Sequence, residues 1–84
     1  MPQVHHQINV RFFAVLREQA GCSALEVSTA ARTAAEFYAE LQTKHALTFP
    51  LSLLRVSINE RYAEMTAPLS SGDRVVFIPP VAGG

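Results

Sequence analysis

The most informative segment for predicting the fold is Arg74-Val75-Val76-Phe77-Ile78-Pro79-Pro80. The last strand is predicted over Arg74–Ile78, and its apolar run from 75 to 78 indicates a position in the centre of a sheet, with both faces covered. The prolines end that strand, because proline has no amide proton to donate to a neighbouring strand. A central strand this late in the sequence must therefore pair with strands from earlier in the chain.

Candidate partner strands lie at both ends of the preceding sequence. Residues 7–16 alternate, with Ile8 and Val10 on one face, which predicts a half-buried strand. Gly21 marks a turn, and the alternation resumes at 24–28, so these segments are expected to form a hairpin. Residues 55–58 predict a third strand.

A helix is expected between these two groups of strands. Thr33 and Glu36 have the spacing of a capping box, which predicts that the helix begins directly after Thr33. Phe37 and Leu41 lie on its apolar face, and Pro50 prevents any continuation.

The order of elements predicts the fold class. After 55–58, Asn59 is typical of a tight turn, and a short strand through Tyr62 precedes the last one. Strand, strand, helix, strand, strand, strand predicts an α+β domain. We expect the first and last strands side by side in a mixed sheet, with one main helix packed on one face. This order of elements resembles the β-grasp arrangement of ubiquitin-like domains, which we therefore expect over residues 1–78, with a flexible tail at 79–84 that ends in Gly-Gly.

Composition limits the classes of function. The 84 residues suffice for one small domain, and seven basic residues balance seven acidic ones. The basic residues are scattered, which argues against nucleic-acid binding and against a polybasic membrane anchor. No membrane-length apolar run or signal peptide is visible, so we expect a cytoplasmic protein. With 49% apolar and only 17% charged residues, an exposed apolar surface for a protein partner is expected.

The side chains offer no catalytic or metal site. Cys22 has no cysteine partner, and its spacing from His5, His6 and His45 fits no metal motif. We assign no role to Cys22, His5 or His6. No nucleophile–base set and no phosphate-binding glycine loop is present, so the chain is not expected to be an enzyme on its own.

The final residues are the strongest candidate for chemistry. From Pro79 the sequence continues Pro80-Val81-Ala82-Gly83-Gly84, and six extended residues reach about 20 Å. Glycine lacks a Cβ, so Gly83 and Gly84 can enter a narrow slot and present a carboxylate to another protein's active site. The alternative is a flexible end without a function.

A candidate docking patch lies beside this tail. If alternate residues of the first strand face the helix, Phe13 faces outward, and Ile78 does the same on the last strand. An apolar outer face at this point is typical of an interface, with Arg11 at its rim. The alternative is that Phe13 packs under a loop.

Several motifs together resemble one known family. They are Phe12-Phe13-Ala14-Val15-Leu16-Arg17-Glu18, Val56-Ser57-Ile58-Asn59, Ser71-Gly72-Asp73 and Phe77-Ile78-Pro79-Pro80-Val81-Ala82-Gly83-Gly84. In this order they are similar to the MoaD family, the small, sulfur-carrying subunits of molybdopterin synthase. The resemblance covers almost the whole chain and departs from it at residues 1–6, which look like extra length.

The resemblance implies a sulfur carrier with no permanently bound cofactor. An E1-like, MoeB-like enzyme would use ATP to adenylate Gly84, and a sulfurtransferase or cysteine desulfurase would convert it to a thiocarboxylate. The large, MoaE-like subunit would then pass the sulfur to cyclic pyranopterin monophosphate, within a heterotetramer. Two other functions stay open: a ubiquitin-like modifier conjugated through Gly84, and the sulfur carrier of thiamin synthesis. The length and the Pro-Pro-Val-Ala sequence favour molybdopterin over thiamin. A purely structural interaction module is the remaining alternative.

Overall fold

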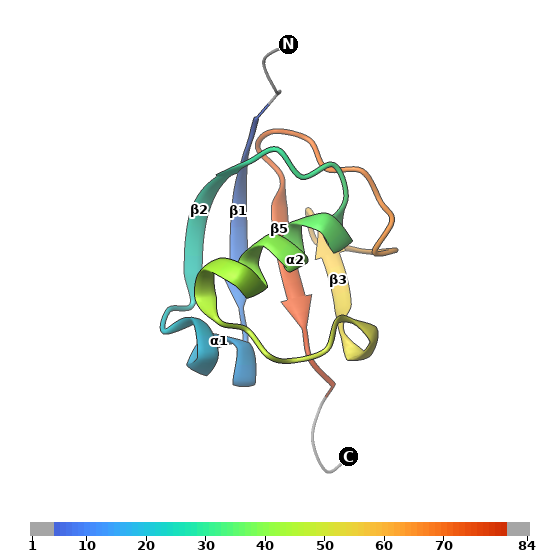
Figure 1. The fold of residues 1–84 in the computed structure, drawn as a ribbon. Helices are drawn as coiled ribbons and strands as arrows, with labels where there is room; N and C mark the ends of the chain where they lie inside the picture. The colour runs from blue at the N-terminus through green and yellow to red at the C-terminus, as the bar shows by residue number, and fades with distance from the viewer. Residues whose placement is uncertain (1–4, 81–84) are drawn as a thin grey trace.

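The computed structural model describes residues 5–80, which form one mixed sheet with α2 across one face (Figure 1). The strand order is β2-β1-β5-β3-β4. The expected α+β, β-grasp arrangement with one main helix is confirmed. The elements are β1 (His6–Phe12), α1 (Val15–Ala20), β2 (Ala24–Thr29), α2 (Ala34–His45), the 3-10 helix η1 (Leu51–Leu53), β3 (Arg55–Ile58), β4 (Arg61–Ala63) and β5 (Arg74–Ile78).

The two strands in the middle of the sheet come from opposite ends of the chain. β1 and β5 run parallel, with Val10 opposite Val75 and Phe12 opposite Phe77. On their other sides, β1 pairs antiparallel with β2, and β5 pairs antiparallel with β3. The predicted adjacency of the first and last strands is thus confirmed, and it fixes where the chain leaves the sheet.

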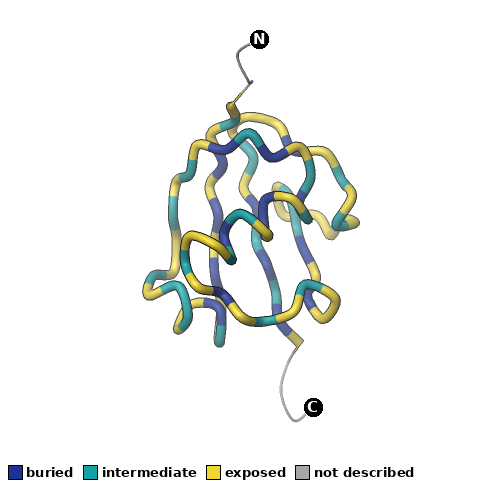
Figure 2. The backbone as a smooth tube through the Cα atoms, in the orientation of Figure 1, coloured by how far each residue is buried: buried dark blue, intermediate teal, exposed yellow. Residues whose placement is uncertain are grey.

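Buried residues lie on the strands and on α2 (Figure 2), and they form one hydrophobic core. Aromatic rings of α2 contact the central strand: the ring centroids of Tyr38 and Phe77 lie 5.0 Å apart, and those of Phe37 and Phe77 lie 6.2 Å apart. Fully burying one such side chain stabilises a fold by about 1.5–3 kcal/mol. The buried apolar residues are Ile8, Val10, Phe12, Leu16, Ala31, Ala34, Phe37, Tyr38, Leu41, Leu47, Leu54, Val56, Leu69, Val75 and Phe77.

Helix α2 begins where the capping box predicts. The Thr33 hydroxyl accepts a hydrogen bond of 3.2 Å from the Glu36 amide. The Glu36 carboxylate in turn accepts one of 2.9 Å from the amide of Arg32. One free amide of the first helical turn, that of Glu36, is therefore paired by a side chain, whereas the Glu36 carboxylate binds the amide before Thr33 and not the Thr33 amide of a regular capping box.

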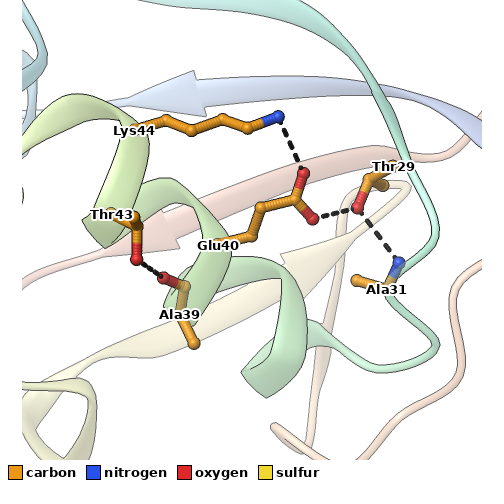
Figure 3. A network of polar contacts seen from close by, with 6 residues as sticks. All are labelled: Thr29, Ala31, Ala39, Glu40, Thr43 and Lys44. Carbon is orange, nitrogen blue, oxygen red and sulfur yellow. Dashed lines mark hydrogen bonds and ion pairs between the residues drawn. The ribbon is translucent and has the colours of Figure 1, made fainter.

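A polar network joins α2 to the end of β2 (Figure 3). The buried hydroxyl of Thr29 donates to a carboxylate oxygen of Glu40 and accepts a 3.0 Å hydrogen bond from the Ala31 amide. The other Glu40 oxygen accepts a 3.1 Å bond from Lys44. Because the Thr29 hydroxyl has both a donor and an acceptor, its burial carries no desolvation penalty from an unpaired group.

Two expectations about the strands are wrong. β1 ends at Phe12, and α1 replaces the tail of the predicted 7–16 strand, so the connection to β2 is more than a hairpin turn. Leu16 of α1 is fully buried, and this burial stabilises the short helix, while Gly21 ends it with φ 78°. A six-residue helix has too few turns to show its period in the sequence.

The second wrong expectation concerns β5, which is central but covered on one face only. Val75 and Phe77 are buried against α2, whereas Val76 and Ile78 on the opposite face stay half-buried.

No helix among residues 5–80 has the length and apolar character needed to cross a membrane.

Candidate functional site

An apolar hollow of about 700 Å³ lies at the point where β5 ends. We call it the tail-base hollow, because the last described residues, Pro79 and Pro80, form one of its walls. Pro79 is buried and Pro80 is exposed. The hollow is lined by Phe13, Ala14, Val15, Phe49, Ile78, Pro79 and Pro80.

The first and last strands bring two of the predicted interface residues together. Phe12 lies opposite Phe77, so the residues that follow them, Phe13 and Ile78, come to the same end of the sheet. Phe13 is not part of the strand, because Ala14 turns the chain into α1 with φ 52° and ψ −126°. Phe13 is 49% exposed and directly follows the buried Phe12.

Phe49 forms a wall of the hollow that the sequence did not predict. Its carbonyl oxygen accepts hydrogen bonds from the Tyr38 hydroxyl, at 2.7 Å, and from the Gln42 side chain, at 3.4 Å. Burial raises the pKa of Tyr38, so its hydroxyl keeps the proton that it donates. The feature of the sequence that could have indicated Phe49 is its position as an aromatic residue next to Pro50, in the loop after α2.

Thr48, the residue before Phe49, connects the same loop to α1 through hydrogen bonds. The Gln19 side chain donates to the Thr48 hydroxyl at 2.9 Å and accepts from the Thr48 amide at 3.0 Å. The wall at Phe49 is therefore held by side chains of both helices. A surface fixed in this way loses little conformational freedom when a partner binds to it.

The third predicted interface residue, Arg11, lies apart from the hollow. It is on the sheet face turned away from α2, where it lines a shallow depression with Glu60, Arg74 and Val76. Arg74 and Glu60 form an ion pair of 3.6 Å there. The structure thus divides the predicted interface into an apolar part at the sheet end and a charged part on the sheet face.

The remaining predicted site residues lie at the end of the chain. Val81, Ala82, Gly83 and Gly84 are outside the described residues. Within residues 5–80, no three His, Cys, Asp or Glu side chains are grouped as metal ligands. The described part of the site is thus an apolar hollow next to the point where the chain leaves the sheet.

Comparison with known proteins identifies the group to which the chain is related. Residues 10–84 match the ThiS family. The molybdopterin synthase sulfur carrier subunit of Haemophilus influenzae is 34% identical over 92% of this chain and 99% of its own length. The protein of the same name from Escherichia coli is 35% identical over the same shares.

Solved structures agree on the fold. The complex of subunits 1 and 2 of the molybdopterin-converting factor from Helicobacter pylori contains a chain that is 28% identical, with a TM-score of 0.65, covering 93% of this chain and 99% of that one. The small archaeal modifier protein 1 of Haloferax volcanii is 22% identical, with a TM-score of 0.76 over 90% of this chain and 99% of its own. The modifier protein shows the fold alone. The chain therefore belongs to the ThiS family, and within it to the MoaD family of molybdopterin synthase sulfur carrier subunits that its motifs resemble.

Proposed function

We propose that this chain carries sulfur to molybdopterin synthase as a thiocarboxylate on Gly84. The observation that supports this most strongly is the 34–35% identity to two sulfur carrier subunits over nearly their whole length. The family match also runs through to Gly84. The chain itself is then a non-catalytic subunit, and the active site belongs to its partner.

The proposed chemistry begins with activation of a poor electrophile. A carboxylate oxygen of Gly84 attacks the α-phosphorus of ATP in an E1-like, MoeB-like enzyme, and pyrophosphate leaves. A persulfide sulfur from a sulfurtransferase or cysteine desulfurase then attacks the acyl carbon, and AMP leaves. The product is an acyl disulfide, and a thiol then attacks the sulfur that belongs to the donor enzyme, forms a new disulfide with it and releases the thiocarboxylate. This acyl transfer follows the usual logic of covalent catalysis, in which one difficult step is divided into easier ones.

The thiocarboxylate is the sulfur donor in the final step. Its charge resides largely on a soft sulfur, which makes it a nucleophile at neutral pH. In the proposed reaction it supplies sulfur to cyclic pyranopterin monophosphate inside the large, MoaE-like subunit, and two rounds complete the dithiolene of molybdopterin. We place this reaction in the cytoplasm and the two kinds of subunit in a heterotetramer.

The tail-base hollow gives this proposal a structural basis. β5 leads from the core directly into Pro79 and Pro80, and the hollow lies beside them. A partner that fills the hollow is therefore bound next to the point from which the tail must reach its active site. The complex of subunits 1 and 2 formed by the Helicobacter pylori relative supports the large subunit as that partner. Docking of this kind converts sulfur transfer into a reaction between groups that are already positioned.

One experiment separates the carrier from the modifier. Incubation with ATP, the activating enzyme and a sulfur source should raise the intact mass by about sixteen units, as oxygen is replaced by sulfur in the activated acyl group. An unchanged mass contradicts the carrier. A ubiquitin-like modifier would instead form a ladder of higher-mass conjugates on a denaturing gel.

A further inference from the structure

The sheet face turned away from α2 carries three arginines around an apolar centre, namely Arg11, Arg55 and Arg74. We call it the outer face. On the central strand it presents Val76 and Ile78, because their neighbours Val75 and Phe77 point into the core. Arg11 of β1 lies opposite Val76, and Arg55 of β3 lies opposite Ile78. An arginine thus flanks the apolar centre on each side.

The acidic residues of this face do not form ion pairs with the two flanking arginines, Arg11 and Arg55. Glu26 lies opposite Asn9 on β2, and Glu60 lies in the turn before β4. Glu60 pairs with Arg74, but no ion pair within residues 5–80 includes Arg11 or Arg55. The whole chain has no net charge, so this face is more basic than the rest of the molecule.

The outer face is continuous with the tail-base hollow. Ile78 belongs to both, since it lies opposite Arg55 in the sheet and also lines the hollow. Tyr62 of β4 lies opposite Ser57 on the same face and is 77% exposed. A partner seated in the hollow therefore extends over a surface that combines apolar side chains with unpaired arginines.

We propose that the outer face selects its partner by charge. Its occupant is the large subunit of molybdopterin synthase, through a surface that places carboxylates opposite Arg11 and Arg55 around an apolar contact with Val76 and Ile78. This inference rests on the proposed function and adds the chemistry by which that partner is recognised. The guanidinium group binds carboxylates through two parallel hydrogen bonds, which fixes orientation as well as proximity.

The charge of the face acts mainly on the rate of association. Opposite charges attract the partners before contact and orient them, and this attraction weakens as salt screens it. The apolar centre then contributes to the lifetime of the complex. A chain with reversed charges at these positions should therefore associate slowly while keeping its fold, because both arginines are exposed.

The test measures binding kinetics with the large subunit from the same organism, at low and at high salt. The full chain is compared with the double variants Arg11→Glu/Arg55→Glu and Arg11→Gln/Arg55→Gln. Arg32→Glu is the matched control, because Arg32 is an exposed arginine just before α2. Melting temperatures establish that each variant is folded.

We expect the Glu variant to associate about tenfold more slowly at low salt, with a salt dependence of opposite sign, because its glutamates repel the carboxylates of the partner and salt screens this repulsion. The Gln variant should be intermediate, and Arg32→Glu should behave like the unchanged chain. Equal rates and equal salt dependence for all chains would overturn the inference and leave the proposed function standing. If the unchanged chain does not bind the large subunit, the inference and the proposed docking both fail. The mass change at Gly84 then reports separately whether the chain carries sulfur.

Discussion

The hydroxyl of Tyr38 donates a hydrogen bond of 2.7 Å to the carbonyl oxygen of Phe49. Tyr38 is fully buried on α2 and its ring also contacts Phe77, whereas Phe49 lines the tail-base hollow. One side chain therefore connects the hydrophobic core, the central strand and the surface that we propose for docking.

Removal of this hydroxyl should weaken the fold. In Tyr38→Phe the Phe49 carbonyl keeps only the longer bond from Gln42, at 3.4 Å. We expect the free energy of unfolding to fall by about 1 kcal/mol, the usual contribution of one such hydrogen bond. Urea denaturation measures the change, and Tyr62→Phe is the matched control because Tyr62 is 77% exposed. Equal losses in the two variants would show that the Tyr38 bond contributes nothing specific.

The same residue predicts a dependence of stability on alkaline pH. Burial raises the pKa of Tyr38 above 10.0, the ordinary value for tyrosine. Above that pH the unfolded chain releases the proton first, so the unfolded state binds fewer protons and stability falls as pH rises. The contribution is complete below pH 10.0 and is lost as the pH passes the pKa of the folded state. The free energy of unfolding should fall less steeply with pH in Tyr38→Phe than in the unchanged chain. The same pH dependence in both chains would contradict the prediction.

Phe13 should contribute to docking more than to the fold. Its side chain is 49% exposed in the tail-base hollow, so Phe13→Ala should leave the melting temperature nearly unchanged. Binding to the large subunit should weaken by more than about 1 kcal/mol if Phe13 anchors the interface. Calorimetry of the complex measures this. Leu53→Ala is the control, because Leu53 is 56% exposed and does not line the hollow. An unchanged affinity would remove Phe13 from the interface.

Deletion of Gly84 should abolish sulfur loading without unfolding the domain. The terminal carboxylate then lies on Gly83, about 3.5 Å short of its position. A displacement of about 1 Å can already slow a positioned reaction on the order of a hundredfold. The buried core lies within residues 8–77, so the melting temperature should not change.

Intact mass after incubation with ATP, activating enzyme and sulfur source measures the effect of the deletion. A chain extended by one glycine is the matched control for length and should fail for the same geometric reason. Normal sulfur loading of the shortened chain would show that Gly84 is not the carrier residue.

The network at the end of β2 predicts a stability difference between two threonines (Figure 3). Thr29→Val preserves the shape of the side chain but leaves the Glu40 carboxylate and the Ala31 amide without their Thr29 partner. We expect a loss of about 1–3 kcal/mol, the usual effect of leaving buried polar groups unpaired. Thr43→Val is the control, since its exposed hydroxyl only donates 3.3 Å to the Ala39 carbonyl within α2. Similar unfolding free energies for the two variants would contradict a specific role of Thr29.

The sequence predicted those elements whose signals are local. The strands at 55–58 and 74–78 have the predicted bounds, and α2 begins after Thr33, because alternation and capping depend only on neighbouring residues. It did not reveal α1, whose six residues are held by the burial of Leu16 and not by a visible period.

The assembly of the candidate site depends on contacts between residues far apart in the sequence. The parallel pairing of β1 with β5 brings Phe13 to Ile78, and the hydrogen bond from Tyr38 adds Phe49 to the same hollow. The register likewise places Arg11 and Arg55 on either side of the central strand. Such neighbours are far apart in the chain, and their contact depends on the packing of the whole core, which no local pattern of residues encodes.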